Sequence, residues 1–434
     1  MRQLVSSVQK KRDLTDSILV LLLIANTAFP FLYRPIESII LSFLFLAFVF
    51  VRRGISLQGV RIEIMLFLIL FVSILLIKVI LKNVTVFVFS GIILRIIYAY
   101  LVLILLKEKL LPRFVTVMYY ITLVSFFFYF TSLASPKLLD FYKEVLSHLV
   151  AKYFPFDQGG GAYKNGYNIL IYDFGQSEYL RNSGPFWEPG AFGGFLLLAL
   201  FFNAFHEPKI FDKKGATFVI GLITTLSTTA YLALFIFLLY YFLFYRRNFI
   251  VVTIVFPFFI LLAVALYSNV SFLNKKIKDH LTEIDRGDRI TAKTRKTRFV
   301  SFLLDFNATL ESPLMGSLEN EKVMAGSKID FREHRTNGLG SLLRKYGFVF
   351  FIYYFCLLYV SFSRMCTYYG QKRSLAFFGV ALVLIIGFSE DYFGLIFFWC
   401  LPLWSIVYSG KPTFVPPVEH KLKPFRLVNL KNEF

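Results

Sequence analysis

Two short segments of this chain place charged side chains directly beside strongly apolar runs. The first, RNSGPFWEPGAFGGF, holds Arg181 and Glu188 among glycines and prolines that fix a tight backbone. A guanidinium at such a place can bind an anion, and a carboxylate can accept a proton. The alternative interpretation is a turn that is closed by a local ion pair between these two side chains.

The second segment, FREHRTNGLGSLLRKYGFVFF, groups polar side chains ahead of another apolar run. They are Arg332, Glu333, His334, Arg335 and Asn337. Histidine and glutamate can act as general bases near neutral pH, and the arginines suit an anionic ligand. Because a lone histidine more often has a structural role, both interpretations of His334 stay open.

A dense basic stretch, KKIKDHLTEIDRGDRITAKTRKTR, precedes the second segment. It contains Arg289, Arg295 and Arg298, and the guanidinium fork of arginine can bind two phosphate oxygens at once. A clustered positive field of this kind favours a phosphate-bearing ligand. The alternative is a solvated basic surface.

The elements that position these residues follow from the composition. Hydrophobic residues make up 57% of the 434 positions and charged residues only 17%, whereas soluble domains carry about 45–50% and about 25%. Apolar runs of roughly 20 residues, the length that crosses a bilayer as helix, recur from end to end. We therefore predict an all-α polytopic membrane protein with one membrane domain over residues 1–434, which excludes a single soluble core.

The net charge of +20 would suggest nucleic acid in a soluble protein, but membrane topology accounts for most of it here. No nucleic-acid partner is expected. The three cysteines, Cys356, Cys366 and Cys400, lie in or beside expected membrane helices, so no disulfide framework is predicted. The basic start before Leu14 resembles a signal sequence without a convincing cleavage site, which predicts an uncleaved first helix.

Hydropathy gives ten clear spans, near residues 14–32, 37–51, 62–81, 86–106, 113–134, 189–205, 249–268, 347–363, 374–388 and 392–408. The apolar stretch from Gly215 to Tyr245 is too long for one upright helix and contains Ser227, Thr228 and Thr229. If it forms two short helices, every short basic connector falls on one side of the membrane, which the positive-inside rule makes cytoplasmic. About twelve transmembrane helices are then predicted, with both termini inside.

This topology places two large loops on the extracytoplasmic side, at 135–187 and 269–346, and a basic cytoplasmic tail at 409–434. Both loops are too long to be mere connectors. The segments that hold Arg181 and His334 form the ends of these two loops. The sequence therefore predicts a site at the outer membrane surface.

The order of these features resembles the family of Wzy-type polymerases and O-antigen ligases. The resemblance rests on four motifs over roughly the last 250 residues. They are the Arg181 to Gly190 loop end, the short-helix pair around Leu226 to Tyr231, the Arg-led helix TRFVSFLLDFNATLESPLMG, and the His334 to Leu343 segment.

The resemblance implies glycosyl transfer at the outer face of a bacterial inner membrane, without metal or other cofactor. Its partners would be undecaprenyl-pyrophosphate-linked glycans as donor and acceptor, the membrane lipids, and a candidate chain-length regulator. Arg181, with one or more of Arg289, Arg295, Arg298 and Arg335, would hold the pyrophosphate, and Asn337 would bind substrate. His334 or Glu188 would accept the proton of the attacking hydroxyl, and Arg335 is counted with this catalytic group.

Two departures from the family pattern favour polymerase over ligase. Ligases carry an arginine after the serine of the short-helix pair, where this chain has Thr228, and their His-Asn pair is split here as His334 and Asn337. Ligation of polysaccharide to a lipid A core stays the alternative. A transporter or flippase is the rival from another class, although no repeated halves are evident.

Arg95, and the pair of Glu390 and Asp391, keep two interpretations each. Arg95, near the middle of the fourth span, is expected to pair with Glu37, Glu63 or backbone carbonyls, or to line the cavity that admits the lipid pyrophosphate. Glu390 and Asp391, in an outer turn, either contact sugar hydroxyls or mark the membrane surface. Trp187 could stack on a sugar ring.

Overall fold

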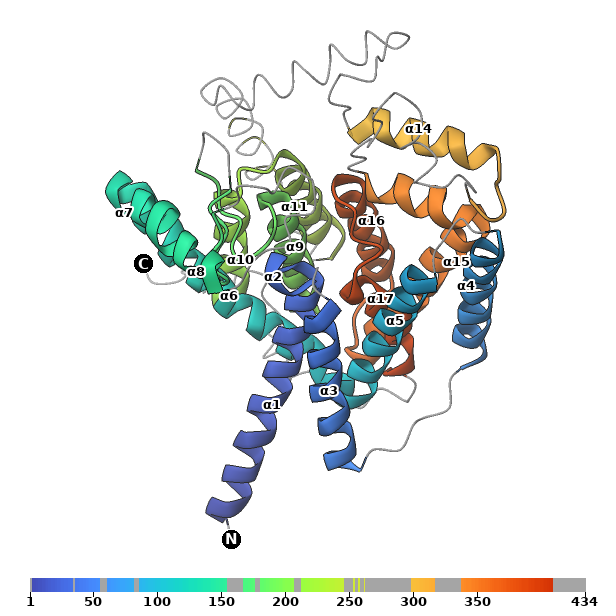
Figure 1. Ribbon diagram of the computed structural model, residues 1–434, viewed down its shortest axis with the longest axis horizontal. Coiled ribbons are helices and arrows are strands. Elements are labelled where there is room, and N and C mark those ends of the chain that lie inside the picture. The colour runs from blue at the N-terminus through green and yellow to red at the C-terminus, as the bar shows by residue number, and fades with distance from the viewer. Residues whose placement is uncertain are drawn as a thin grey trace, which may run out of the picture.

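The computed structural model describes residues 2–33, 36–54, 61–81, 86–153, 167–175, 180–206, 212–245, 298–316 and 337–408, with Thr253, Pro257 and Leu261 as isolated positions. These residues form a bundle of helices (Figure 1). Within them β pairing is confined to one isolated bridge between Asn168 and Asp173. The expectation of an all-α architecture is confirmed for this part of the chain.

The first half of the bundle runs from α1 to α8. Its helices are α1 (Arg2–Ala28), α2 (Pro30–Tyr33), α3 (Ile36–Arg53), α4 (Ile62–Ile80), α5 (Val86–Leu106), α6 (Leu110–Ala134), α7 (Pro136–Asp140) and α8 (Ser147–Tyr153), with a 3₁₀ turn at Lys107–Lys109 and a π-helical turn at Phe141–Leu146. The beginning of the expected first outer loop is thus helical.

The second half supplies most of the candidate site. Its helices are α9 (Pro189–His206), α10 (Lys213–Thr224), α11 (Thr228–Tyr240), α14 (Arg298–Leu310), α15 (Gly338–Tyr368), α16 (Ser374–Ser389) and α17 (Ile396–Leu403), with a π-helical turn at Tyr241–Tyr245 and a 3₁₀ turn at Trp404–Ile406.

Membrane character is evident in the length and hydropathy of these helices. Three helical stretches are long and apolar enough to cross a bilayer: Ile62–Ile80, Val88–Ala134, which takes in α5 and α6, and Gly338–Tyr368. Four shorter apolar helices accompany them, at Pro189–Phe205, Thr228–Leu243, Ser374–Ser389 and Ile396–Ile406. The chain is an all-α membrane protein. The count of twelve spans stays a prediction, and the expected span at 249–268 and the tail at 409–434 lie outside the described residues apart from the isolated positions.

The stretch from Gly215 to Tyr245 folds as the expected pair of short helices. The break between α10 and α11 has a local cause, since Leu226 adopts a positive φ of 47° and the Ser227 hydroxyl accepts the Ala230 amide as the N-cap of α11. Thr225 bonds back to the Leu222 carbonyl and helps to end α10. Polar side chains therefore gather at the break.

A second break divides α15. Gly347 has φ 77° and ψ 175°, so a segment over 338–346 meets the long membrane segment at an angle. The turn after α14 fits into this corner: the Phe348 amide donates to the Pro313 carbonyl at 2.8 Å. The segment over 338–346 therefore runs alongside α14 at one end of the bundle (Figure 1).

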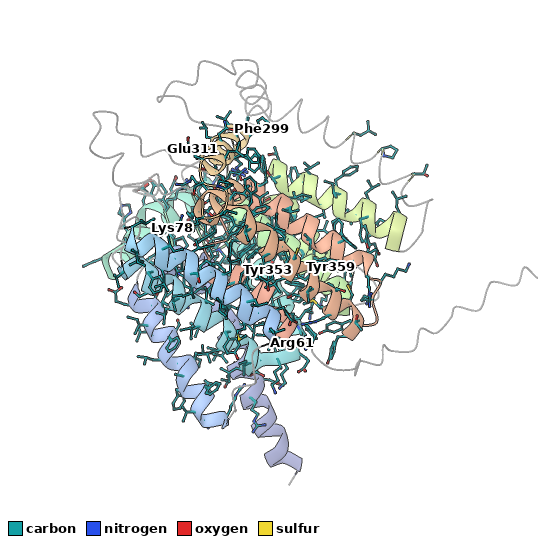
Figure 2. All side chains as sticks on the ribbon, turned by 90° about the vertical axis from the view of Figure 1, so that its right-hand side faces the viewer. Arg61, Lys78, Phe299, Glu311, Tyr353 and Tyr359 are labelled. Atoms are coloured by element: carbon teal, nitrogen blue, oxygen red, sulfur yellow. The ribbon has the colours of Figure 1, made fainter. Side chains whose placement is uncertain are left out.

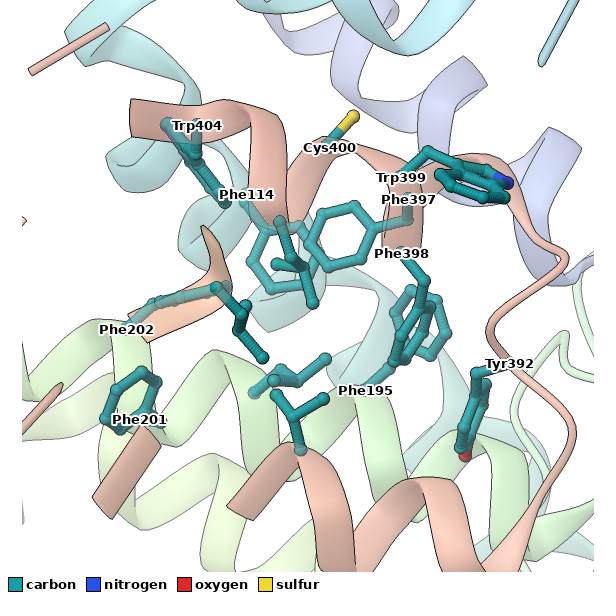
Figure 3. Close-up of a cluster of buried hydrophobic side chains, with 14 of the residues drawn as sticks. Phe114, Phe195, Phe201, Phe202, Tyr392, Phe397, Phe398, Trp399, Cys400 and Trp404 are labelled. Atoms are coloured by element: carbon teal, nitrogen blue, oxygen red, sulfur yellow. The ribbon is translucent and has the colours of Figure 1, made fainter. Parts of the chain in front are cut away.

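Aromatic side chains fill the core and join distant parts of the chain. Phe114 of α6 stacks on Phe397 of α17 with ring centroids 4.7 Å apart, and Phe195 of α9 lies against the same ring at 5.5 Å. Figure 3 shows these rings gathered with Phe398 and Trp404. The core thus packs α9 against α17. The site lies near the N-terminal ends of these two helices.

Ion pairs bring the basic connectors together at the end of the bundle away from α14. Asp16, 1% exposed, pairs with Arg53 at 2.7 Å and with Lys109 at 3.4 Å. Glu63 pairs with Arg364 at 2.6 Å and lies 3.8 Å from Arg61. In Figure 2 Arg61 lies far from Phe299 of α14 and from Glu311 in the turn that follows it. These connectors share acidic partners, as expected of residues on one side of the membrane. That this side is cytoplasmic stays a prediction.

Candidate active site

The segment from Arg181 to Glu188 is anchored on the break between the short helices. Asn182 is fully buried, its amide donates to the Thr224 carbonyl at 3.0 Å, and its side chain donates to the Thr224 and Ser125 hydroxyls. Arg181 donates from Nε to the Thr225 carbonyl at 3.1 Å. The arginine is therefore held beside the N-terminus of α11.

Glu188 precedes the first turn of α9 and accepts the Phe192 amide on its backbone carbonyl. Its carboxylate accepts a hydrogen bond from the Trp187 indole at 3.2 Å, and its carboxyl is hydrogen-bonded to that of Glu390. Trp187, whose ring lies 5.9 Å from that of Tyr392, thus orients Glu188.

Arg298, the first residue of α14, is bonded to α11, to the end of α16 and to the turn after α16. Nη2 pairs with Oε1 of Glu390 at 2.5 Å, and Nη1 donates to the hydroxyls of Ser389 at 2.6 Å and Thr229 at 3.4 Å. Glu390 is 6% exposed and Arg298 24% exposed. Because charge-assisted hydrogen bonds in a mostly buried place are strong and directional, the guanidinium is fixed in orientation.

The family pattern expects an arginine directly after the serine at the break between the two short helices. Thr228 occupies that position, yet Arg298 reaches the hydroxyl of its neighbour Thr229, and Arg181 reaches the preceding Thr225 carbonyl. Two guanidinium groups therefore approach the break in space from positions far away in sequence. The positive charge expected there is supplied by other elements.

Asn337 supports Arg298 through the backbone. Its side chain caps α15 by accepting the Gly340 amide at 2.9 Å and donates to the Arg298 carbonyl at 3.2 Å. The residue is fully buried. Both functional ends of the side chain are used within the protein, which gives Asn337 a positioning role, and its expected role in substrate binding stays a prediction.

Burial and charge set the ionisation of the loop residues. Burial lowers the pKa of Arg181, and the neighbouring Glu188, Tyr231 and Glu390 oppose this effect. Burial alone would raise the pKa of Glu188, but the hydrogen bond with Glu390, the charge of Arg298, the Trp187 bond and Arg181 outweigh it and lower that pKa. Glu188 is thus ionised at neutral pH.

The glycine of the Glu-Pro-Gly motif leaves room for this arrangement. A Cβ on Gly190 would lie 2.5 Å from Oε1 of Glu390, closer than atoms can pack. Tyr392 closes the same corner, since its hydroxyl lies 3.2 Å from the carbonyls of Gly190 and Ala191. Gly190 is therefore needed for the close approach of α9 to the turn after α16.

The structure thus unites four of the expected site residues, Arg181, Glu188, Arg298 and Asn337. Arg289, Arg295, His334 and Arg335 lie outside the described residues. Arg95, on α5, lies elsewhere, where it interacts electrostatically with Tyr346. Glu63, one of its expected partners, pairs with Arg364 and Arg61 instead.

Sequence reasoning missed several contributors. Glu390 was expected only as a surface marker or sugar contact, and Thr229 only as part of the polar break between two short helices. Ser389 and Tyr392 gave no signal because such residues are common near helix ends. Asp305 did offer a signal in the sequence, since a carboxylate in the apolar face of an amphipathic helix needs a partner. In the structure Asp305 is fully buried and pairs with Arg344 at 2.9 Å. In the described part of the chain no group of three or more His, Cys, Asp or Glu residues is suited to a metal.

No family model, curated protein or solved structure matches this chain. The chemistry open to the site follows from its own groups. Two fixed guanidinium groups can stabilise negative charge that develops on a ligand, and the coupled carboxyls can accept one proton.

Proposed function

We propose that this protein is a membrane glycosyltransferase that polymerises oligosaccharide repeat units carried on undecaprenyl pyrophosphate, at the outer face of a bacterial inner membrane. The observation that carries the proposal is the cluster of Arg181, Arg298, Glu188 and Glu390, drawn from the segment before α9, the start of α14 and the turn after α16. On this proposal the chain crosses the membrane about twelve times with both termini inside.

The chemistry needs the groups that the cluster contains. An acceptor hydroxyl attacks the anomeric carbon of the donor sugar, the bond from that carbon to the phosphate oxygen breaks, and the pyrophosphate leaves with the electron pair. Arg181 and Arg298 would stabilise the added negative charge, since preorganised donors at a developing charge contribute strongly to the rate. Glu188, or His334 on the adjoining segment, would take the hydroxyl proton.

Positioning supplies much of the remaining rate. A pyrophosphate is already a good leaving group, so holding donor and acceptor in line can account for several orders of magnitude. The short polar helix ends around Thr225 and Ser227 are rigid platforms for this purpose. No metal or other cofactor is required by the proposal.

The test is an assay with purified protein in nanodiscs and a synthetic polyprenyl-pyrophosphate oligosaccharide. Products longer than one repeat unit, formed with only this lipid present, support the polymerase; Arg181→Ala should remove them, and Lys137→Gln, a change of an exposed lysine on α7, should not. Transfer only to an added lipid A core would instead identify a ligase. Absence of any glycosyl transfer by well-folded protein would refute both and favour the transporter class.

A further inference from the structure

A second polar cluster adjoins the candidate active site through a single peptide unit. Glu390 faces Arg298, but the next residue, Asp391, faces the other way and meets the segment over 338–346. Oδ2 of Asp391 accepts the Ser341 hydroxyl at 3.0 Å and lies 3.5 Å from Nζ of Lys345. The turn after α16 thus serves two separate groups of charged side chains.

Two further basic groups converge on the same end of this segment. Lys78, on the last turn of α4, is 6% exposed, and its ammonium donates to the Lys345 carbonyl at 2.6 Å. Figure 2 shows Lys78 at the end of α4 opposite to Arg61. Arg95 and Asp391 both interact electrostatically with Tyr346. Lys78, Arg95, Lys345 and Asp391 are called the Lys345 cluster below.

A structural role alone does not account for this cluster. Exposed ion pairs such as Lys345 with Asp391 contribute little to stability, whereas basic side chains within membrane helices, as on α4 and α5, are costly and mark functional paths. The neighbouring Arg344 is engaged by Asp305. Basic groups therefore exceed carboxylates within the cluster, and Lys345 is 40% exposed and accessible to a ligand.

We propose that the Lys345 cluster is a second anion-binding site, which holds the pyrophosphate that the acceptor substrate keeps. This inference rests on the proposed function, because extension of a lipid-linked glycan needs two lipid pyrophosphates at once. One leaves during transfer, and the other stays attached to the product. Each requires cationic groups near the membrane surface, and Glu390 and Asp391 place the two groups of cations side by side.

The division of labour follows from the chemistry on each side. The Arg298 side carries coupled carboxyls and fixed guanidinium groups, which suit bond breaking and proton transfer. The Lys345 cluster holds its carboxylate against the Ser341 hydroxyl and the partly exposed ammonium of Lys345. Ammonium groups bind phosphate as point charges, without the bidentate geometry of arginine, which suits a ligand that must be released after every extension.

Binding of farnesyl pyrophosphate, a short polyprenyl pyrophosphate, to the protein in nanodiscs of neutral phosphatidylcholine tests the proposal. Wild type should bind two molecules per chain. Lys345→Gln should weaken one of them at least tenfold, Arg298→Gln should weaken the other, and the control Lys137→Gln should weaken neither. Because Lys345 is partly exposed, its variant should keep the wild-type melting temperature.

The outcomes separate this inference from the proposed function. Two sites of unchanged affinity in Lys345→Gln would overturn the second site. Loss of one site in Lys345→Gln while Arg298→Gln keeps both would support the second site and contradict the donor site. If phosphatidylglycerol in the nanodiscs displaces the probe from the Lys345-dependent site, that site binds a phospholipid headgroup and its assignment to the acceptor is wrong.

Discussion

The guanidinium of Arg298 pairs with the carboxylate of Glu390 at 2.5 Å, and this contact joins the first residue of α14 to the turn that follows α16. It is the centre of the candidate site, because Ser389, Thr229 and Glu188 all meet one of its two partners. The contact predicts how stability and activity can be separated by substitution.

Removing Arg298 alone should destabilise the protein, since Arg298→Met leaves Glu390 buried without its partner, at a cost of about 3–5 kcal/mol. The double variant Arg298→Met with Glu390→Gln should recover most of that stability and still lack polymer synthesis. Thermal melting and the polymerase assay measure the two effects. The matched control is the buried pair at the other end of the bundle: Arg53→Met with Asp16→Asn should leave synthesis near wild type, and equal loss of activity there would argue against a special role for Arg298.

Adding one methyl group at Gly190 should disrupt the site. A Cβ there would lie 2.5 Å from Oε1 of Glu390, so Gly190→Ala should push that carboxylate away from Arg298 and lower kcat at least tenfold. Gly91 of α5 has no atom within 4 Å of such a Cβ, so Gly91→Ala should be neutral or stabilise the helix by about 0.5–1 kcal/mol. Full activity of Gly190→Ala would show that the closeness of α9 and Glu390 is unimportant.

The identity of the general base can be decided by the pH dependence of kcat/KM. Because the pKa of Glu188 is lowered from its ordinary value of 4.5, a rate that depends on ionised Glu188 should be independent of this group from about pH 5 upward. If His334 is the base, activity should fall as pH drops through about 6.5.

Variants complete this test. Glu188→Gln keeps an acceptor for the Trp187 indole and should lower the rate by about 10²–10⁴-fold if Glu188 is the base. If His334 is the base, His334→Gln should lower the rate to a similar extent and abolish the fall of kcat/KM near neutral pH. If the fall of kcat/KM at low pH remains in both variants, another group accepts the proton.

The loop before the site should be more stable in acid. Burial raises the pKa of Asp173 from 3.8 to about 7, against the opposing bonds from Gly175 and Asn168, and the Asp173 amide ties this loop to the Gly184 carbonyl. A carboxyl with a raised folded pKa binds its proton more tightly in the native state, so stability is greatest below about pH 4 and falls as pH rises through about 7. The fall is at most about 4 kcal/mol.

Asp173→Asn should remove this dependence, because the amide keeps an oxygen to accept the Gly175 amide and cannot ionise. The melting temperatures of wild type and variant, compared between about pH 5 and about pH 7.5, measure the difference. Parallel slopes for the two proteins would contradict the buried, protonated state of Asp173. Asp212, the N-cap of α10, offers a control carboxyl at the end of that helix away from the break.

The helical class and the short-helix pair could be predicted from sequence because each rests on local pattern. Apolar runs indicate helices, and Ser227 in the middle of an apolar stretch indicates a cap between two of them. The contribution of Arg181, Glu188 and Arg298 to one site was also expected, from their position beside apolar runs. The exact partners were not, because Arg298 and Glu390 are 92 residues apart in sequence and nothing local links them.

Asn337 illustrates the other limit of sequence reasoning. Its place near His334 suggested substrate binding, but an asparagine immediately before Gly-Leu-Gly is equally typical of a helix cap, and the cap is what the structure contains. Arg95 shows the same difficulty, because Glu63 has more suitable cations at its own end of the bundle. The partner of a charged side chain depends on tertiary packing, which the sequence pattern alone does not specify.

The contact between α1 and α17 has a consequence for biosynthesis. The Thr27 hydroxyl of α1 accepts the Phe397 amide, 370 residues later, and at about 5–20 residues per second a ribosome needs roughly 20–70 s to make that stretch. Until then Thr27 is satisfied within α1 by the Leu23 carbonyl. Glu390 emerges almost equally late, so the contact between Arg298 and Glu390 at the centre of the candidate site cannot form in a nascent chain before that time.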